Sequence, residues 1–168
     1  TSDQTSELAK NLGINIVKLN EVDYIDLTID GADEVDLNLN GIKGGGGALL
    51  FEKIVAAASE KVIWIVDSSK FVKKLGKFPL PVEVVPLAAN HIIKRFKESG
   101  YSPVIRMNGS KIYITDSGNE IIDLHLHEIE DSIKLEQEIK LIPGVVEVGL
   151  FNNFADNVII GKGNSTEI

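Results

Sequence analysis

The 168 residues are enough for one domain, or for one domain with a small insertion, and 43% of them are apolar, which suits a well-buried core. The sequence contains no run of about 18 apolar residues, so it predicts no membrane span. The absence of cysteine excludes disulfides and thiolate chemistry. The formal net charge of −8 argues against a nucleic-acid surface, and an anionic ligand would need local positive charge or backbone amides aimed at it.

The first part of the chain alternates helices with strands. Helices are expected over residues 5–12 and 48–60, and strands over residues 14–18, 24–30 and 61–67. The glycine at position 13 ends the first helix, and Leu50, Ile54 and Ala57 are expected on one face of the second. The strands are nearly continuous apolar runs, which is typical of a parallel sheet covered on both sides.

The pattern changes from about Pro81. It runs strand, helix, strand and then again strand, helix, strand, with a hairpin turn at residues 116–119, and this order is typical of a ferredoxin-like domain. A last strand over residues 157–163 could return to the first sheet. The fold class is therefore α/β, a mostly parallel sheet with helices on both faces plus an inserted ferredoxin-like α+β domain. The expected boundaries are residues 1–77 and 150–168 for the first domain and 78–149 for the insert.

Acidic residues follow the strand over residues 24–30. Ligands of open parallel sheets bind beyond the carboxyl ends of the strands, so Asp30 and Asp33 lie where a site is expected. Aspartate also favours turns, and on spacing alone a capping role is the stronger interpretation. The next stretch, "DLNLNG" from Asp36 to Gly41, imitates the start of a calcium loop. Its twelfth position is Gly47 instead of a bidentate glutamate, so we expect no metal.

Four glycines then lead straight into a helix in "KGGGGALLFEK". Free amides at a helix start can face an anion or a polar ligand, although a flexible loop is the simpler interpretation. Lys43 supplies a cation beside the glycines, and Lys70 brings another to the same sheet edge. Glu52, expected in the second helical turn, is either a base with a pKa raised by Asp30 and Asp33 or a solvated helix residue.

Several blocks together resemble ribose-5-phosphate isomerase type A. The blocks are "IDGADEVD", "IKGGGGALLFEKI", "SSKFVKKLGKFPLPVEV", "IPGVVEVGLF" and "ADNVIIG". The resemblance runs through the whole chain. It implies a Rossmann-like domain with a ferredoxin-like insert, and an aldose–ketose isomerase that interconverts ribose 5-phosphate and ribulose 5-phosphate in the pentose phosphate pathway. It implies no metal or cofactor.

The resemblance also assigns roles to residues of this chain. Glu52 matches the proton acceptor, and the matched substrate-binding residues are Asp30, Gly31, Ala32, Asp33, Lys43, Gly44, Gly45, Gly46 and Lys70. For the chemistry, we expect Lys43 to stabilise the enediolate and Asp30 to assist ring opening. The expected partner is a sugar phosphate, with no nucleic acid and no membrane. A cytoplasmic homodimer or homotetramer is expected.

The chain departs from the family at its start. Members begin with roughly fifty more residues, a size typical of one or two βα units, and these carry a turn that holds the substrate phosphate. No such turn occurs in this sequence. We therefore expect this chain alone to be weakly active or inactive, and its sheet to have a bare edge.

Two other functions compete with the isomerase. A sugar-phosphate-binding regulatory domain would bind without turnover and would not need a base at Glu52. A transferase acting on an acyl-carrier cofactor would need a glutamate nucleophile in a different loop context. The combination of the DGAD and KGGG blocks with Glu52 and Lys70 favours the isomerase.

Overall fold

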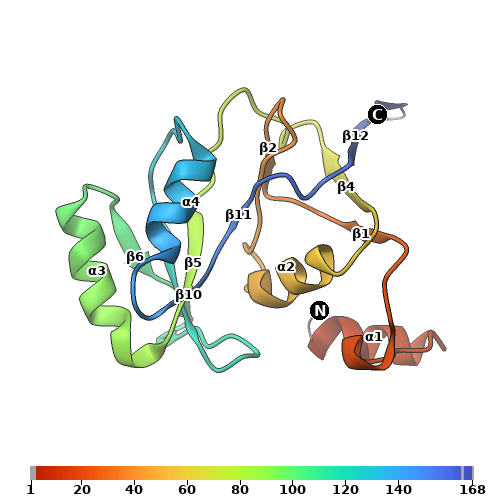
Figure 1. The fold of residues 1–168 in the computed structure, drawn as a ribbon, viewed down its shortest axis with the longest axis horizontal. Helices are drawn as coiled ribbons and strands as arrows, with labels where there is room; N and C mark the ends of the chain where they lie inside the picture. The colour runs from red at the N-terminus through yellow and green to blue at the C-terminus, as the bar shows by residue number, and fades with distance from the viewer. Residues whose placement is uncertain (1–2, 164, 168) are drawn as a thin grey trace.

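A computed structural model describes residues 3–163 and 165–167 (Figure 1). Its first sheet has the order β1-β4-β12-β13. The bounds are Thr28–Asp30 for β1, Val62–Asp67 for β4, Asn157–Lys162 for β12 and Ser165–Glu167 for β13. The first three strands are parallel, and β13 adds an antiparallel edge. The last long strand thus returns to the first sheet, as its sequence predicts, and the short β1 lies at the bare edge.

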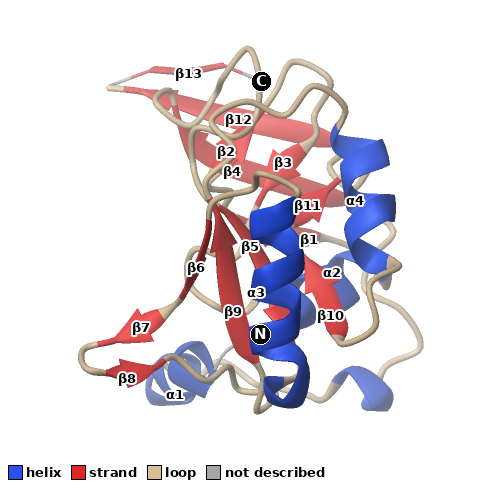
Figure 2. Ribbon diagram, turned by 90° about the vertical axis from the view of Figure 1, so that its left-hand side faces the viewer, coloured by secondary structure: helices blue, strands red, loops and turns tan. Residues whose placement is uncertain are grey.

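The second sheet is antiparallel throughout, with the order β10-β5-β9-β6. Its strands are β5 (Leu80–Val84), β6 (Pro103–Ile105), β9 (Glu120–Leu124) and β10 (Val145–Val148). Helices α3 (Ala89–Glu98) and α4 (Ser132–Lys140) lie along it (Figure 2). This order and these connections are the ferredoxin-like arrangement, and the predicted α/β class with such an insert is confirmed.

A small third sheet lies between the other two. It has the order β11-β3-β2, with β2 at Glu34–Val35, β3 at Gly41–Ile42 and β11 at Leu150–Phe151. Because β11 directly follows the ferredoxin-like segment, this sheet joins the two parts of the chain. The Glu34 carboxylate, 4% exposed, strengthens the junction by accepting bonds of 2.7 Å from the amides of Gly76 and Phe78.

The remaining elements are short. They are α1 (Asp3–Asn11), α2 (Leu49–Ala57), the hairpin strands β7 (Met107–Asn108) and β8 (Lys111–Ile112), and the 3-10 turns at Leu19–Glu21 and Pro86–Ala88. The predicted turn over residues 116–119 is present, closed by a bond from Gly118 N to Thr115 O of 2.8 Å. None of the helices in the described part of the chain is long and apolar enough to cross a membrane.

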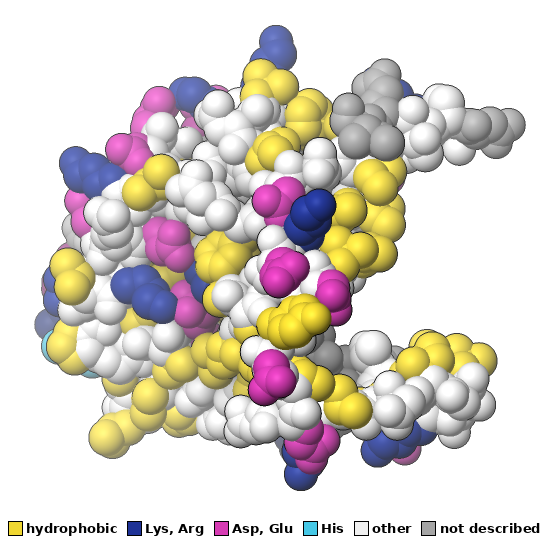
Figure 3. All heavy atoms as spheres, turned by 45° about the vertical axis from the view of Figure 1, so that its right-hand side comes forward, with side chains coloured by type: hydrophobic (Ala, Val, Ile, Leu, Met, Phe, Trp, Pro, Cys, Tyr) yellow, Lys and Arg dark blue, Asp and Glu magenta, His cyan; other side chains and the backbone are white. Residues whose placement is uncertain are grey.

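Two apolar clusters form the core. One fills the ferredoxin-like part, where β5 is buried along its whole length beneath α3 and α4. The other places Trp64 of β4 against Leu49 of α2 and Phe151 of β11. The opposite face of the first sheet carries Ile29 and Ile65, which are 60% and 50% exposed, and Figure 3 shows apolar side chains at the surface on this side. Helices were predicted on both faces of the first sheet. The described residues cover one of these faces.

Two local predictions were wrong. Residues 14–18 form no strand, and their apolar side chains Ile14, Ile16 and Val17 are exposed. The buried positions of α2 are Leu49, Lys53 and Ala56, whereas the predicted Ile54 is 43% exposed. Apolar spacing does not predict this face, because its central residue, Lys53, is charged.

The buried Lys53 is stabilised by a network of acceptors from the ferredoxin-like part. Its ammonium lies 2.9 Å from Glu147 Oε1 and 2.8 Å from Glu136 Oε1, and it donates to the carbonyls of Val148 and Leu150 at 2.7 and 2.6 Å. Burial raises the pKa of Glu147, but the ammonium groups of Lys53 and Lys140 outweigh it and hold that pKa below its usual range. The buried Lys53 ammonium is tolerated because two carboxylates and two carbonyls accept its hydrogen bonds.

Replacing Lys53 by alanine is therefore expected to destabilise the fold by about 3–5 kcal/mol, because it leaves a buried carboxylate short of its partner. Urea unfolding at pH 7.5 measures this free energy. The matched control is Lys94→Ala, which removes an exposed pair with Glu98 at 4.0 Å and should cost about 0.5 kcal/mol or less. A loss below about 1 kcal/mol for the Lys53 variant would show that Lys140 alone satisfies Glu147.

Candidate active site

The end of β1, the residue that follows β3 and the first turn of α2 lie close together at the carboxyl end of β1. The strand ends at Asp30, and the chain then passes Gly31, Ala32 and Asp33 before β2. After the turn, β3 delivers Lys43 to the same place, and the glycine segment leads into α2. Glu52 lies in the first turn of α2, not in the second as predicted, because the helix begins only at Leu49. Its position near the helix start brings its carboxylate back to the strand end.

Lys43 is the centre of the cluster. It is only 4% exposed, and its ammonium lies 2.9 Å from Asp30 Oδ2 and 3.2 Å from Glu52 Oε2. It also donates a bond of 2.5 Å to the carbonyl of Gly31. The ring of Phe151 lies under it, with the centroid at 5.5 Å. These contacts fix a cation between two carboxylates at the end of a strand.

Glu52 has an unusual environment for a carboxylate. Burial raises its pKa, Lys43 lowers it, and the negative charges of Asp30 and Asp33 raise it again, so that the net shift is upward. Within residues 3–163 and 165–167, no group donates a hydrogen bond to the buried Oε2 in good geometry, although the Lys43 ammonium is near. A buried carboxylate with a raised pKa beside a fixed ammonium is suited to accept a proton.

Asp33 connects the strand end with the glycine segment. Its Oδ2 accepts a bond of 2.8 Å from the amide of Gly45, and its Oδ1 lies 4.0 Å from the ammonium of Lys70. Lys70 follows β4, so its cation reaches the same edge from the neighbouring strand. Unlike Lys43, it is more than a third exposed, which leaves it available to an anionic ligand.

The glycines are required by geometry at two positions. Gly44 has a φ of +105°, in the region that side chains rarely adopt. At Gly45 a Cβ would lie 2.8 Å from Asp33 Oδ1 and 2.9 Å from the ring of Phe78. A side chain at position 45 would therefore collide with the Asp33 carboxylate and with the Phe78 ring.

These residues line one open cavity of about 190 Å³. Its walls are formed by every predicted substrate-binding residue except Lys70, together with Glu52: Asp30, Gly31, Ala32, Asp33, Lys43, Gly44, Gly45, Gly46 and Glu52. No set of three or more acidic or histidine side chains among the described residues is arranged to hold a metal ion. The "DLNLNG" segment forms a turn instead, in which Asp36 Oδ1 accepts from the amides of Asn38 and Asn40.

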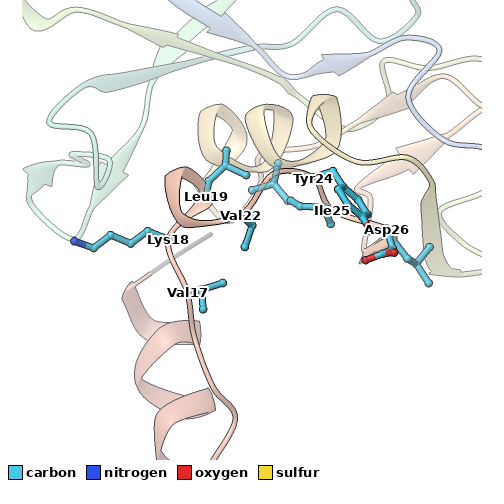
Figure 4. A pocket seen from close by; sticks show the side chains of 9 residues that line it. Val17, Lys18, Leu19, Val22, Tyr24, Ile25 and Asp26 are labelled. Atoms are coloured by element: carbon cyan, nitrogen blue, oxygen red, sulfur yellow. The ribbon is translucent and has the colours of Figure 1, made fainter.

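A larger groove lies elsewhere. It has a volume of about 500 Å³ and is lined by residues 17–19, 22 and 24–27 together with Val55 of α2 (Figure 4). Its labelled side chains are mostly apolar, and the charged Lys18 and Asp26 lie apart at its two ends (Figure 4). It contains no pair of charged groups that could act on a substrate together, so we place the chemistry in the smaller cavity.

Sequence reasoning missed the groups behind the glycine segment. Arg106 and Tyr113 of the ferredoxin-like part bond to carbonyls of Gly44, Gly45 and Gly46. No spacing signal relates residues about 60 positions apart, so these contacts emerge only from the packing of the two parts.

Comparison with known proteins gives one consistent result. The family model described as "Ribose 5-phosphate isomerase A (phosphoriboisomerase A)" matches residues 1–165. The ribose-5-phosphate isomerase A of Limosilactobacillus reuteri (strain DSM 20016) is 56% identical over 168 residues, which are all of this chain and 74% of that protein.

Solved structures agree with this match. The ribose 5-phosphate isomerase A of Methanocaldococcus jannaschii is 44% identical, with a TM-score of 0.92 over 99% of this chain and 74% of that one. A D-ribose-5-phosphate isomerase in complex with phospho-erythronic acid is 42% identical, with a TM-score of 0.95 and the same coverage.

The raised pKa of Glu52 has a consequence for stability. A carboxyl whose folded pKa lies above its unfolded value of 4.5 makes the fold less stable as the pH rises through that interval. Replacing Glu52 by glutamine should therefore raise the urea midpoint at pH 7.5, and the gain should vanish well below pH 4.5, where the carboxyl is protonated in both states. Glu60→Gln, at an exposed position, is the control. A lower midpoint at pH 7.5 would mean that attraction to Lys43 outweighs burial.

Proposed function

This chain belongs to the ribose 5-phosphate isomerase A family, and from that premise we propose how its residues interconvert D-ribose 5-phosphate and D-ribulose 5-phosphate. The reaction is an aldose–ketose isomerisation of the non-oxidative pentose phosphate pathway. The observation that carries the assignment of roles is the buried Glu52 carboxylate, whose pKa is raised and which lies 3.2 Å from the Lys43 ammonium.

Glu52 moves the proton between the two carbons. It removes the proton from C2 of the open-chain aldose, and the electron pair of that bond forms the C1–C2 double bond of an enediolate. The protonated Glu52 then returns the proton to C1, while the hydroxyl proton of O2 passes to O1. A carboxylate whose pKa is raised above its ordinary value by burial is a stronger proton acceptor than an ordinary glutamate.

Lys43 stabilises the charge that develops on the oxygens. As C2 loses its proton, the carbonyl oxygen on C1 becomes negative, and a fixed cation in a buried site lowers the energy of that state more than that of the neutral substrate. The ammonium needs no reorganisation because Asp30 and the Gly31 carbonyl already hold it.

Asp30 and Asp33 act on the hydroxyl groups. Opening of the furanose ring requires a group that takes the proton of the C1 hydroxyl while the ring oxygen gains one, and Asp30 is our candidate for this exchange. Asp33, fixed by the Gly45 amide and facing Lys70, orients further hydroxyls. The backbone of Gly31, Ala32, Gly44, Gly45 and Gly46 lets the sugar approach closely, and Lys70 supplies charge for its anionic end.

The neighbour that binds phospho-erythronic acid supports this assignment. That compound is a phosphorylated sugar acid. Its carboxylate is a negatively charged group with two oxygens, and the enediolate is likewise negatively charged, with one oxygen on each of two adjacent carbons. A regulatory domain that binds without turnover is not favoured, since binding alone gives no reason to bury a carboxylate whose pKa is raised.

The setting of the enzyme is part of the proposal. We place it in the cytoplasm as a homodimer or homotetramer, with no cofactor, no nucleic acid and no membrane partner. We assign residues 1–77 and 150–168 to a Rossmann-like catalytic domain and residues 78–149 to the ferredoxin-like insert. The two sheets, which the small third sheet joins, support this division.

Replacing Glu52 by glutamine in the full-length protein is expected to lower kcat by about 10²–10⁴, because it removes the general base and keeps the shape. A coupled assay with ribose 5-phosphate measures the turnover, and calorimetry with phospho-erythronic acid tests whether the site still binds. Glu60→Gln is again the control. Turnover within a few fold of the wild type would refute the role of Glu52 as the base.

The pH profile tests the electrostatic part of the proposal. The acidic limb of kcat/KM should lie above pH 4.5, since it reports the raised pKa of Glu52 in the free enzyme. Asp30→Asn removes a charge that raises this pKa, so the limb should move to lower pH, whatever the loss of rate. Asp23→Asn, at an exposed position, should leave the limb in place. A limb that moves upward or stays fixed in the Asp30 variant contradicts this coupling.

A further inference from the structure

The ferredoxin-like part reaches the glycine segment through Arg106. This residue lies between β6 and β7, and its Nη1 donates to the carbonyl of Gly44 at 2.8 Å and to that of Gly45 at 3.1 Å. The chain has only one other arginine, Arg95, which lies exposed on α3. One guanidinium nitrogen therefore holds two successive peptide groups of the segment that borders the cavity.

Arg106 is itself fixed by Asp123 of β9. Its Nε donates to Asp123 Oδ2 at 2.9 Å and its Nη2 to Oδ1 at 2.5 Å, and both side chains are largely buried. This bidentate geometry allows little rotation of the guanidinium. The Tyr113 ring lies 6.0 Å from the guanidinium carbon, and its hydroxyl donates to the carbonyl of Gly46 at 3.3 Å. The carbonyls of three consecutive glycines are thus fixed from the same side.

Fixing these carbonyls also fixes the amides on the opposite side. In a planar trans peptide the C=O and the following N–H point in opposite directions. With the Gly44 carbonyl on Arg106, the Gly45 amide points away from it, and it donates to Asp33 Oδ2. With the Gly45 carbonyl also on Arg106, the Gly46 amide is turned away in the same manner. In the part of the chain that the structure describes, the Gly46 amide donates to no backbone or side-chain acceptor.

We propose that Arg106, held by Asp123, is a positioning residue for the isomerisation. By anchoring the carbonyls of Gly44 and Gly45 it orients the Gly45 amide toward Asp33 and leaves the Gly46 amide free for an oxygen of the bound sugar. The insert thereby takes part in the reaction without touching the substrate. This inference rests on the proposed function.

The experiment compares variants of the full-length protein. Arg106→Gln combined with Asp123→Asn removes the anchor and leaves no unpaired charge, Arg106→Lys keeps one donor, and Arg95→Gln is the matched control in the same domain. Thermal unfolding checks the fold, and kcat and KM with ribose 5-phosphate and the Kd of phospho-erythronic acid report the site. Spectra of protein labelled with ¹⁵N-glycine report the amides of Gly45 and Gly46 directly.

The double variant should keep a cooperative unfolding transition and lose about 10- to 100-fold in kcat/KM, since small misplacements of a site have effects of this size. Its Gly45 and Gly46 amide signals should shift, whereas those of distant glycines such as Gly13 stay. Arg106→Lys should be intermediate, and Arg95→Gln should behave as the wild type. If the double variant fails to fold, Arg106→Lys decides by the same measurements.

Two results would overturn the inference. One is kcat/KM within two-fold of the wild type in a folded Arg106 variant, and the other is lost activity with unmoved Gly45 and Gly46 signals. An inactive wild-type protein would instead count against the proposed function. In that event, unshifted glycine amides and an unchanged Kd for phospho-erythronic acid in the Arg106 variants would refute the positioning role separately.

Discussion

Burial of one ammonium group, that of Lys43, is the constraint on which the site depends. A cation that is almost fully removed from water must be matched by acceptors, or it loses its charge. Asp30, Glu52 and the Gly31 carbonyl supply these acceptors, so the strand end, the loop after it and the first turn of α2 are drawn to one point. In the same arrangement, burial and the negative charges of Asp30 and Asp33 raise the pKa of Glu52, the group that we assign as the base, by more than Lys43 lowers it. The residues that neutralise Lys43 therefore also determine the electrostatic environment of Glu52.

A second buried lysine, Lys53, joins the first sheet to the ferredoxin-like part. It lies one residue after Glu52 on α2 and turns toward β10 and α4, where Glu147 and Glu136 receive it. Both ammonium groups lie over the ring of Phe151, at 5.5 Å for Lys43 and 4.8 Å for Lys53. A single aromatic residue of the joining sheet therefore contacts both the cluster around Lys43 and the network around Lys53. A change in the packing of β11 should therefore alter the surroundings of both Lys43 and Lys53.

Much of this arrangement could be predicted from the sequence, for physical reasons. Asp30, Lys43 and Glu52 lie within one short stretch, and the strand, turn and helix signals around them are local, so their convergence follows from the topology of a βα unit. Lys53 and Arg106 could not be predicted in the same way. An apolar-periodicity argument assigns a lysine to the surface, because it does not include the buried carboxylates that lie 83 and 94 residues away. Residues 14–18 have a strand-like composition, but pairing partners decide whether a strand forms, and none is present among the described residues.

The Arg106 anchor has a consequence for how the enzyme acquires its activity as it folds. The groups that hold Lys43 lie within 13 residues of it along the chain, so this cluster closes short loops with a small loss of entropy. The bonds from Arg106 span 62 and 61 residues to Gly44 and Gly45, and α2, β4, β5, α3 and β6 lie between them. Contacts of such separation form late, after their own elements are folded. We therefore expect the cluster around Lys43 to form before the Arg106 anchor, so that a molecule whose ferredoxin-like part is still unfolded would bring Asp30, Lys43 and Glu52 together but leave the glycine backbone unanchored.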